Sequence, residues 1–295
     1  MTSGVRLGIY EKALQTTLGW DTFFGQVNDA GFSFCDLSID ETPERSARLT
    51  WPAAERARVR QAARGAGVQV GGLCLSLHRK VMPGSVDPGI RRQALDVYHQ
   101  GIQLASDLGV TVVQVAGYYA YYEPDDPGSR GRYVDTLRAA VPMAAREGVI
   151  LAIENVDGHD IASIGDAMSV VREIDSPWVQ TYPDIGNIAE HGGDATAELR
   201  DGEGHMVAIH VKDVLPGQPR RVPFGTGVAD FPAAFAELKR QDWSGRLMLE
   251  MWNDESPNSV SVCRTARAYI TELVAAAGLP IVEDRRYGHD ARGAA

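Results

Sequence analysis

A regular alternation of short apolar stretches and longer helical stretches runs through most of the 295 residues. Because strands built of such stretches are buried on both faces, they are typical of a parallel sheet covered by helices. The stretches that we expect to form strands are Val5–Tyr10, Phe32–Ile39, Val68–Leu75, Val110–Ala116, Val149–Glu154, Val179–Asp184, Met206–Val211 and Arg246–Glu250. Helices are expected near Trp20–Ala30, Trp51–Ala66, Pro88–Leu108, Gly128–Glu147, Ile164–Ile174, Ala195–Gly202, Phe231–Gln241 and Ser259–Ala277.

Glycines support this division, because Gly31, Gly67, Gly109 and Gly148 each stand just before an expected strand, where left-handed backbone is easiest for glycine. No glycine-rich nucleotide loop follows the first strand. Eight strand–helix units in under 300 residues therefore favour an α/β fold of the (β/α)8 TIM barrel type over a doubly wound sheet. With no linker in sight, we predict one domain over residues 1–278, followed by a charged tail, 279–295, that is mobile or caps a neighbour.

Composition and charge limit what this protein can bind. The net charge of −10 argues against an extended nucleic-acid-binding surface, which needs clustered Lys and Arg. Three cysteines without metal-binding spacing are expected to be reduced and buried: Cys35, Cys74 and Cys263. No stretch approaches the roughly 20 apolar residues of a membrane span, and no signal sequence precedes Val5. We therefore predict a cytoplasmic protein that acts on a small molecule.

Four consecutive expected strands end on a side chain that can bind a metal ion. These are Glu154, Asp184, His210 and Glu250, separated by 30, 26 and 40 residues, or one strand–helix unit each time. A single carboxylate after a strand usually caps a helix, but four such ends open on the same face of a barrel. Two glutamates, an aspartate and an imidazole suit Mn²⁺, Mg²⁺ or Co²⁺ better than a thiolate-loving metal.

Several longer stretches carry a family resemblance. The chain resembles the xylose-isomerase-like TIM barrel superfamily, and within it the L-ribulose-5-phosphate (L-xylulose-5-phosphate) 3-epimerase family, over roughly residues 5–278. The stretches that resemble this family are Leu7-Gly-Ile-Tyr-Glu-Lys-Ala-Leu14, Leu37-Ser-Ile-Asp-Glu-Thr42, Cys74-Leu-Ser-Leu-His-Arg79, Val115-Ala-Gly-Tyr118, Tyr182-Pro-Asp-Ile-Gly-Asn187, His210-Val-Lys-Asp213, Val222-Pro-Phe-Gly-Thr-Gly227 and Glu250-Met-Trp252. The His-Val-Lys-Asp stretch is shared across the superfamily, whereas the first and third stretches point to the phosphosugar branch.

The resemblance implies a divalent ion, Mn²⁺ as the first expectation, held by Glu154, Asp184, His210 and Glu250. It also implies that Glu154 and Glu250 are catalytic. A ketose bound through its carbonyl has an acidified C3 proton because the metal stabilises the enediolate, and two groups on opposite faces can then exchange that proton. Related epimerases of unphosphorylated sugars carry a histidine where this chain has Asn187, and an amide cannot shuttle protons.

A phosphosugar also needs cations or backbone amides at the rim of the pocket. In the loop after the seventh strand, Arg221 is the predicted phosphate contact. Arg220 and the backbone amides of Gly225-Thr-Gly227 are further candidates in the same loop. Lys212 is either a pocket cation or half of an ion pair, and Trp252 and Tyr118–Tyr122 either wall the pocket or pack against helices. The residues that we predict to contact substrate are Lys12, His78, Arg79, Asn187, Lys212, Arg221 and Trp252.

Other functions compatible with the same barrel remain open at this point. A free ketose 3-epimerase or an aldose–ketose isomerase, such as a hexulose-phosphate isomerase, would use the same enediolate chemistry. A DNA-repair endonuclease needs more histidines at strand ends and a less acidic chain, and a non-enzymatic barrel would not need the ligand set. We predict a metal-dependent isomerase, a 3-epimerase of a ketopentose 5-phosphate, that forms a homo-oligomer, either a dimer or a tetramer.

Overall fold

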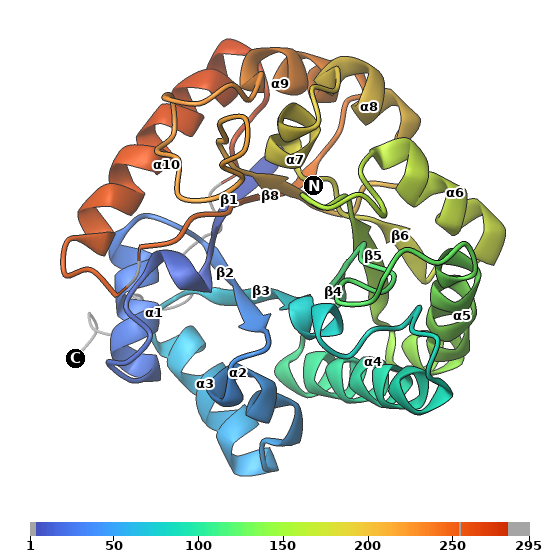
Figure 1. The fold of residues 1–295 in the computed structure, drawn as a ribbon. Helices are drawn as coiled ribbons and strands as arrows, with labels where there is room; N and C mark the ends of the chain where they lie inside the picture. The colour runs from blue at the N-terminus through green and yellow to red at the C-terminus, as the bar shows by residue number, and fades with distance from the viewer. Residues whose placement is uncertain (1–3, 254, 283–295) are drawn as a thin grey trace.

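The computed structural model describes residues 4–253 and 255–282. Within these ranges the eight strands form one parallel sheet that curls into a ring, with the helices outside it (Figure 1). The strands are β1 (Val5–Tyr10), β2 (Phe34–Ile39), β3 (Gln69–Leu75), β4 (Val112–Ala116), β5 (Ile150–Glu154), β6 (Val179–Thr181), β7 (Ile209–Val211) and β8 (Gly245–Leu249). The predicted (β/α)8 TIM barrel is confirmed.

The predicted helices also form, and α2 and α7 are additions that the sequence analysis did not anticipate. The helices are α1 (Trp20–Asp29), α2 (Pro43–Ser46), α3 (Ala53–Gly65), α4 (Pro88–Leu108), α5 (Ser129–Glu147), α6 (Ile164–Ile174), α7 (Ile185–Glu190), α8 (Ala195–Asp201), α9 (Phe231–Arg240) and α10 (Ser259–Ala276). Gly109 and Gly148 end α4 and α5 in left-handed backbone, with φ of 74° and 68°, as their positions predicted. No helix among the described residues is long and apolar enough to cross a membrane.

The sheet is hydrogen-bonded in the order β6-β5-β4-β3-β2-β1-β8-β7. Between β6 and β7 the ring is joined only by isolated parallel bridges, Thr181 to Met206 and Asp184 to His210. Both strands are shorter than predicted, with three residues each. Pro183 follows β6 and has no amide hydrogen to extend the ladder. This junction, formed by the two bridges, is called the seam below.

Two kinds of core stabilise the barrel. A large apolar cluster lies between strands and helices and includes Ile9, Phe23 and Phe235. Smaller clusters inside the ring centre on Phe34 and Tyr182, because alternate residues of each strand point inward. All three cysteines lie in described segments, where they are buried and free, as predicted.

The start of the predicted tail belongs to the barrel. Leu279 is buried, and Ile281 forms a parallel bridge with Val5 at the beginning of β1. The amide of Val282 donates to the carbonyl of Val5 at 2.9 Å. The rest of the predicted tail, 283–295, lies outside the described residues. Residues 279–282 therefore pack on the barrel beside β1.

Candidate active site

The four predicted metal ligands meet at the carboxyl ends of β5 to β8. Glu154 is the last residue of β5, His210 lies in β7, and Glu250 directly follows β8. Asp184 lies beyond β6, where its carboxylate accepts from the amide of Asn187 at 3.1 Å and so caps α7. One oxygen or nitrogen of each ligand lies within 4.8 Å of those of the others.

Ion pairs connect the ligands to each other and to Lys212. His210 Nδ1 lies 2.7 Å from Glu154 Oε1 and 4.0 Å from Asp184 Oδ2. Lys212 Nζ lies 2.8 Å from Asp184 Oδ2 and 3.4 Å from Glu250 Oε2. Lys212 is 4% exposed and lines the pocket, so both of the interpretations of Lys212 that the sequence left open hold.

This crowding of charges shifts the acid–base behaviour of the ligands. Burial by itself lowers the pKa of His210, but the attraction of Glu154, Glu250 and Asp184 outweighs burial and raises the pKa to about 9. Burial, together with repulsion from Glu250 and Glu154, raises the pKa of Asp184 to about 6 despite Lys212. For Glu250 the attraction of Lys212 and His210 outweighs burial, and its pKa is lowered.

The donor set fits a divalent metal ion. Three carboxylates and one imidazole are ligands that Mn²⁺, Mg²⁺ and Co²⁺ accept, and their atoms already converge within 4.8 Å. Asp184 is almost completely buried, so its negative charge needs a cation close by. Lys212 supplies one positive charge from the side of Asp184 and Glu250, and a protonated His210 supplies another.

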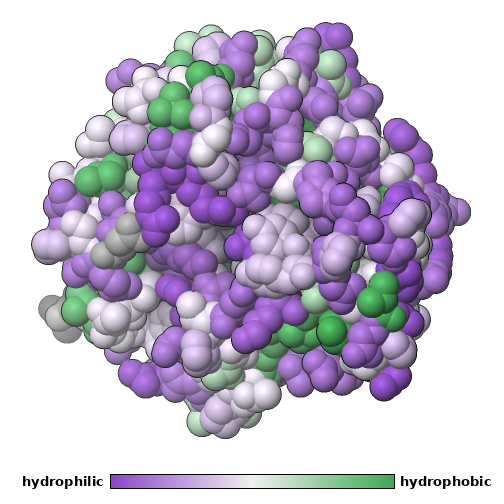
Figure 2. Space-filling view, viewed as in Figure 1, coloured by the Kyte–Doolittle hydropathy of each residue, from purple (hydrophilic) through white to green (hydrophobic). Residues whose placement is uncertain are grey.

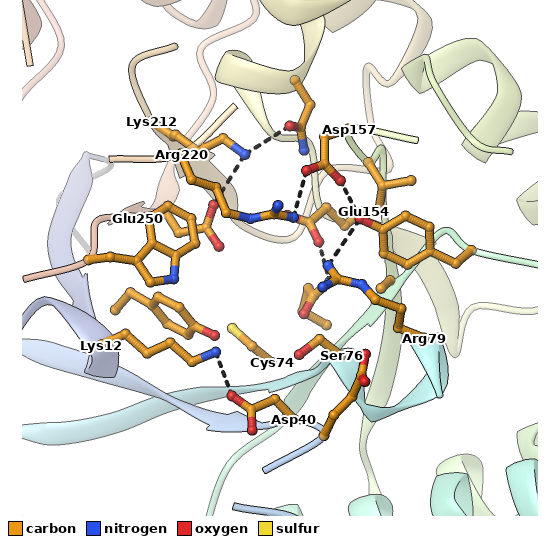
Figure 3. A pocket seen from close by; sticks show the side chains of 18 of the residues that line it. Lys12, Asp40, Cys74, Ser76, Arg79, Glu154, Asp157, Lys212, Arg220 and Glu250 are labelled. Carbon is orange, nitrogen blue, oxygen red and sulfur yellow. Dashed lines mark hydrogen bonds and ion pairs between the residues drawn. The ribbon is translucent and has the colours of Figure 1, made fainter. Parts of the chain in front are cut away.

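Above the ligands opens a pocket of about 220 Å³, seen from close by in Figure 3. Of the predicted substrate contacts, five line it: Lys12, Arg79, Asn187, Lys212 and Trp252. The amide nitrogen of Asn187 donates to Asp184 Oδ2 at 3.0 Å, and its oxygen accepts from Lys212 at 2.8 Å. Trp252 packs edge-on against the ring of Tyr10, with ring centroids 6.0 Å apart. The structure therefore brings these residues to one cavity.

His78 does not reach the pocket, so the structure does not support the predicted contact with substrate. Its Nε2 lies 3.0 Å from the carbonyl oxygen of Ala94 in α4, and its ring packs at a tilt against Tyr98. Burial lowers the pKa of His78 to about 4, which leaves the ring uncharged at neutral pH. The reason is a short 3-10 helix over Ser76–Arg79, in which neighbouring side chains point in different directions.

The loop after β7 also differs from the prediction. Arg220 lines the pocket, whereas the predicted Arg221 is exposed and is not among the lining residues. The amides of Gly225 and Gly227 donate to Asp213 at 2.8 and 2.9 Å, so they are engaged in holding the loop and are not offered to a ligand. Asp213 therefore shapes this loop, a role that its sequence position did not reveal.

Loops from three parts of the barrel meet at the rim of the pocket. Asp157, after β5, accepts a hydrogen bond from the hydroxyl of Tyr118 and pairs with Arg220 at 2.6 Å. Arg79 donates to the same hydroxyl at 3.3 Å and lies over the rings of Tyr118 and Tyr121. Arg79 and Arg220 thus point toward one another from opposite walls (Figure 3).

Sequence reasoning missed several polar residues of the pocket. Gln114 in β4 donates to Glu154 Oε2 at 2.6 Å and fixes that carboxylate. Asp40, after β2, pairs with Lys12 at 2.5 Å, and this contact together with hydrogen bonds to Thr42 lowers the pKa of Asp40 to about 2 despite partial burial. The only sequence signal was that Asp40 and Thr42 lie in a stretch that carries the family resemblance.

Figure 2 shows hydrophilic residues gathered around the hollow centre of the face that Figure 1 presents.

Comparisons with known proteins agree with this fold. The model of the Xylose isomerase-like TIM barrel family matches residues 24–273. The structure of an L-ribulose 3-epimerase superposes with a TM-score of 0.79 at 18% identity, covering 93% of this chain and 96% of that one. A D-psicose 3-epimerase from Clostridium cellulolyticum H10, solved with D-tagatose, superposes with a TM-score of 0.78 at 16% identity, covering 91% and 99%. The chain therefore belongs to the Xylose isomerase-like TIM barrel family.

A relative with a higher sequence identity shows to which family of these barrels the chain belongs. The L-ribulose-5-phosphate 3-epimerase UlaE of Salmonella paratyphi C is 40% identical over 279 residues, which are 95% of this chain and 98% of the relative. The homologous protein of Salmonella typhimurium is also 40% identical over the same lengths. The chain therefore belongs to the L-ribulose-5-phosphate 3-epimerase family within the Xylose isomerase-like TIM barrels, and it is an isomerase.

Proposed function

We propose that this protein is a metal-dependent 3-epimerase that interconverts L-ribulose 5-phosphate and L-xylulose 5-phosphate. The observation that carries the proposal is the pair Glu154 and Glu250, which line the same small pocket from β5 and from the end of β8. Epimerisation at C3 breaks a C–H bond on one face of the sugar and forms one on the other, so it requires two proton-transferring groups.

Each glutamate has partners that hold it in place. Glu154 accepts from Gln114 and faces His210, while Glu250 is paired with Lys212. One carboxylate takes the C3 proton, and the other returns a proton to the opposite face. A divalent ion bound by the four ligands, with Mn²⁺ as the first choice and Mg²⁺ or Co²⁺ as alternatives, would polarise the ketose carbonyl and make that proton more acidic.

The remaining pocket residues suit the rest of a phosphosugar. Asn187 and Lys212 offer an amide and an ammonium group beside the ligands, where sugar hydroxyls can bind. Arg79 and Arg220 converge at the rim and offer fork-shaped donors that match a phosphate. Lys12, beside Asp40, adds a third cation. A cytoplasmic homo-oligomer remains our prediction for the assembly.

Incubating the purified protein with Mn²⁺ and L-xylulose 5-phosphate in D₂O tests the proposal. We expect L-ribulose 5-phosphate to form with deuterium at C3, because the returned proton comes from the other glutamate, whose carboxyl group has exchanged with the D₂O solvent. Unphosphorylated L-xylulose under the same conditions is the matched control. Turnover of the free sugar alone would favour a free ketose 3-epimerase, and an aldose product would favour an aldose–ketose isomerase.

A further inference from the structure

Beneath the ligands, the interior of the barrel holds a buried carboxylate bonded to a buried phenol. Asp36 in β2 is 2% exposed, and Tyr182, just after β6, is 1% exposed. The hydroxyl of Tyr182 donates to Asp36 Oδ2 at 2.9 Å. Burial raises the pKa of Asp36 despite the attraction of Arg246, so keeping this polar pair inside the barrel costs free energy. A costly feature of this kind calls for a functional explanation.

Neighbouring strands are built to leave room for this pair. A Cβ on Gly71 would lie 2.5 Å from Asp36 Oδ1, and one on Gly72 would lie 2.7 Å from Oδ2. Tyr182 packs among small side chains of β5 and the approach to β7, Ala152 and Ala208. The small residues therefore allow a large phenol and a carboxylate to occupy the centre of the ring.

Tyr182 connects this pair to the ligand layer through His210. The ring of Tyr182 lies against the imidazole, with centroids 4.3 Å apart and planes inclined by 59°. The Nδ1 atom of His210 faces Glu154, while Nε2 lies 4.0 Å from the sulfur of Cys74. A histidine that binds a metal usually donates its second N–H to a strong acceptor, and a thiol sulfur is a weak one. The Tyr182 ring is therefore the firmer contact that His210 makes on the side away from the carboxylates.

We infer that Tyr182 and Asp36 are positioning residues, which hold the imidazole of His210 in the orientation where Nδ1 faces the carboxylates. Asp36 fixes the phenol by its hydrogen bond, and the phenol ring in turn restricts rotation of the imidazole. The inference rests on the proposed function in one respect, namely that His210 is a metal ligand. The orientation of its ring in the metal-free protein is independent of that function.

The test compares four variants, Tyr182→Phe, Asp36→Ala, Asp36→Asn and Tyr98→Phe. Tyr98→Phe is the matched control, because Tyr98 is also fully buried but its hydroxyl has no hydrogen-bond partner among the described residues. Two readouts are needed. The first is the ring ¹⁵N and ¹H NMR signals of His210 in metal-free protein, and the second is Mn²⁺ affinity, measured from the EPR signal of the free ion.

We expect Tyr182→Phe and Asp36→Ala to shift the His210 ring signals and to weaken Mn²⁺ binding by about tenfold. Asp36→Asn, which keeps an acceptor for the phenol, should restore most of the affinity, and Tyr98→Phe should match the wild type. His210 signals in Tyr182→Phe that are identical to the wild type would overturn the inference. If the wild type binds no divalent ion, the proposed function fails, and the ring signals still decide the positioning role.

Discussion

The wall of the pocket has two halves with different chemistry. The half formed by β5 to β8 contributes three carboxylates and an imidazole whose atoms converge within 4.8 Å, and a buried ammonium group that pairs with two of the carboxylates. The half formed by β1 to β4 contributes Lys12, Arg79 and Gln114, which stand farther apart and mostly nearer to solvent. Strand ends joined by a ladder can place atoms precisely, whereas loops can vary in length. We therefore assign reaction chemistry to the first half and substrate choice to the second.

The largest effect should come from the first half. Glu154→Gln and Glu250→Gln should each lower kcat by about 10³-fold, because an amide can neither accept nor return the C3 proton. Turnover of L-xylulose 5-phosphate in saturating Mn²⁺ measures this loss. Glu203→Gln, at an exposed site outside the pocket, is the control and should retain full activity. A Glu variant with more than a tenth of wild-type kcat would contradict the assignment.

A smaller and different effect is expected for the two arginines that we propose to bind the phosphate, Arg79 of the second half and Arg220 in the loop between β7 and β8. Arg79→Met and Arg220→Met should each raise KM for the phosphosugar by about 10- to 100-fold, the range for losing a charged hydrogen bond, with little change in kcat. Arg221→Met is the matched control, since Arg221 is adjacent in sequence but outside the pocket lining. An unchanged KM in both variants would remove the arginines from the substrate site.

Metal binding to the first half should depend on pH, because two of its candidate ligands have shifted pKa values. His210 keeps its proton until the pH rises through about 9, whereas an ordinary histidine loses it near 6.5. Each bound ion must therefore displace one proton between pH 6 and 9, and Mn²⁺ affinity should increase about tenfold per pH unit. Below pH 6 Asp184 is protonated as well, so the slope should steepen. Calorimetry in two buffers of different ionisation enthalpy counts the protons, and an affinity independent of pH would contradict this account.

The smallest effect on activity is expected for His78→Gln. His78 bonds to the carbonyl of Ala94 and packs against Tyr98, so the change should leave KM within about twofold and cost about 1 kcal/mol of unfolding free energy. Thermal denaturation and steady-state kinetics measure the two quantities. A KM that rises as far as in Arg79→Met would return His78 to the substrate site.

The fold was predictable because each strand and helix follows from local apolar pattern and from glycines at helix ends. The error at Val179–Asp184 has a local cause. The sequence Tyr182-Pro183-Asp184 was interpreted as the end of a strand, but proline stops the ladder and the aspartate caps α7. Pro183 and the capping residue were both visible, and the apolar pattern outweighed them.

The candidate ligands were predictable for a similar reason, since residues at consecutive strand ends must be neighbours in a barrel. The rim was not. Arg79 and His78 are adjacent in sequence yet point to opposite sides of a 3-10 turn, and Asp157 lies in a loop whose path no periodicity describes. Gln114 occupies an inward position of β4, and nothing in the sequence shows that it contacts Glu154.

The seam between β6 and β7 lies at the candidate metal site, so an ion bound there would affect the stability of the barrel wall. One of its two bridges joins Asp184 to His210, which are themselves two of the four candidate ligands. An ion bound by both residues would link β6 to β7, the two neighbouring strands of the barrel that are connected only by isolated bridges. Loading the ion would then stabilise this joint and removing it would let the joint open, so amide exchange in β6 and β7 would report occupancy while exchange in β1 to β4 stays unchanged.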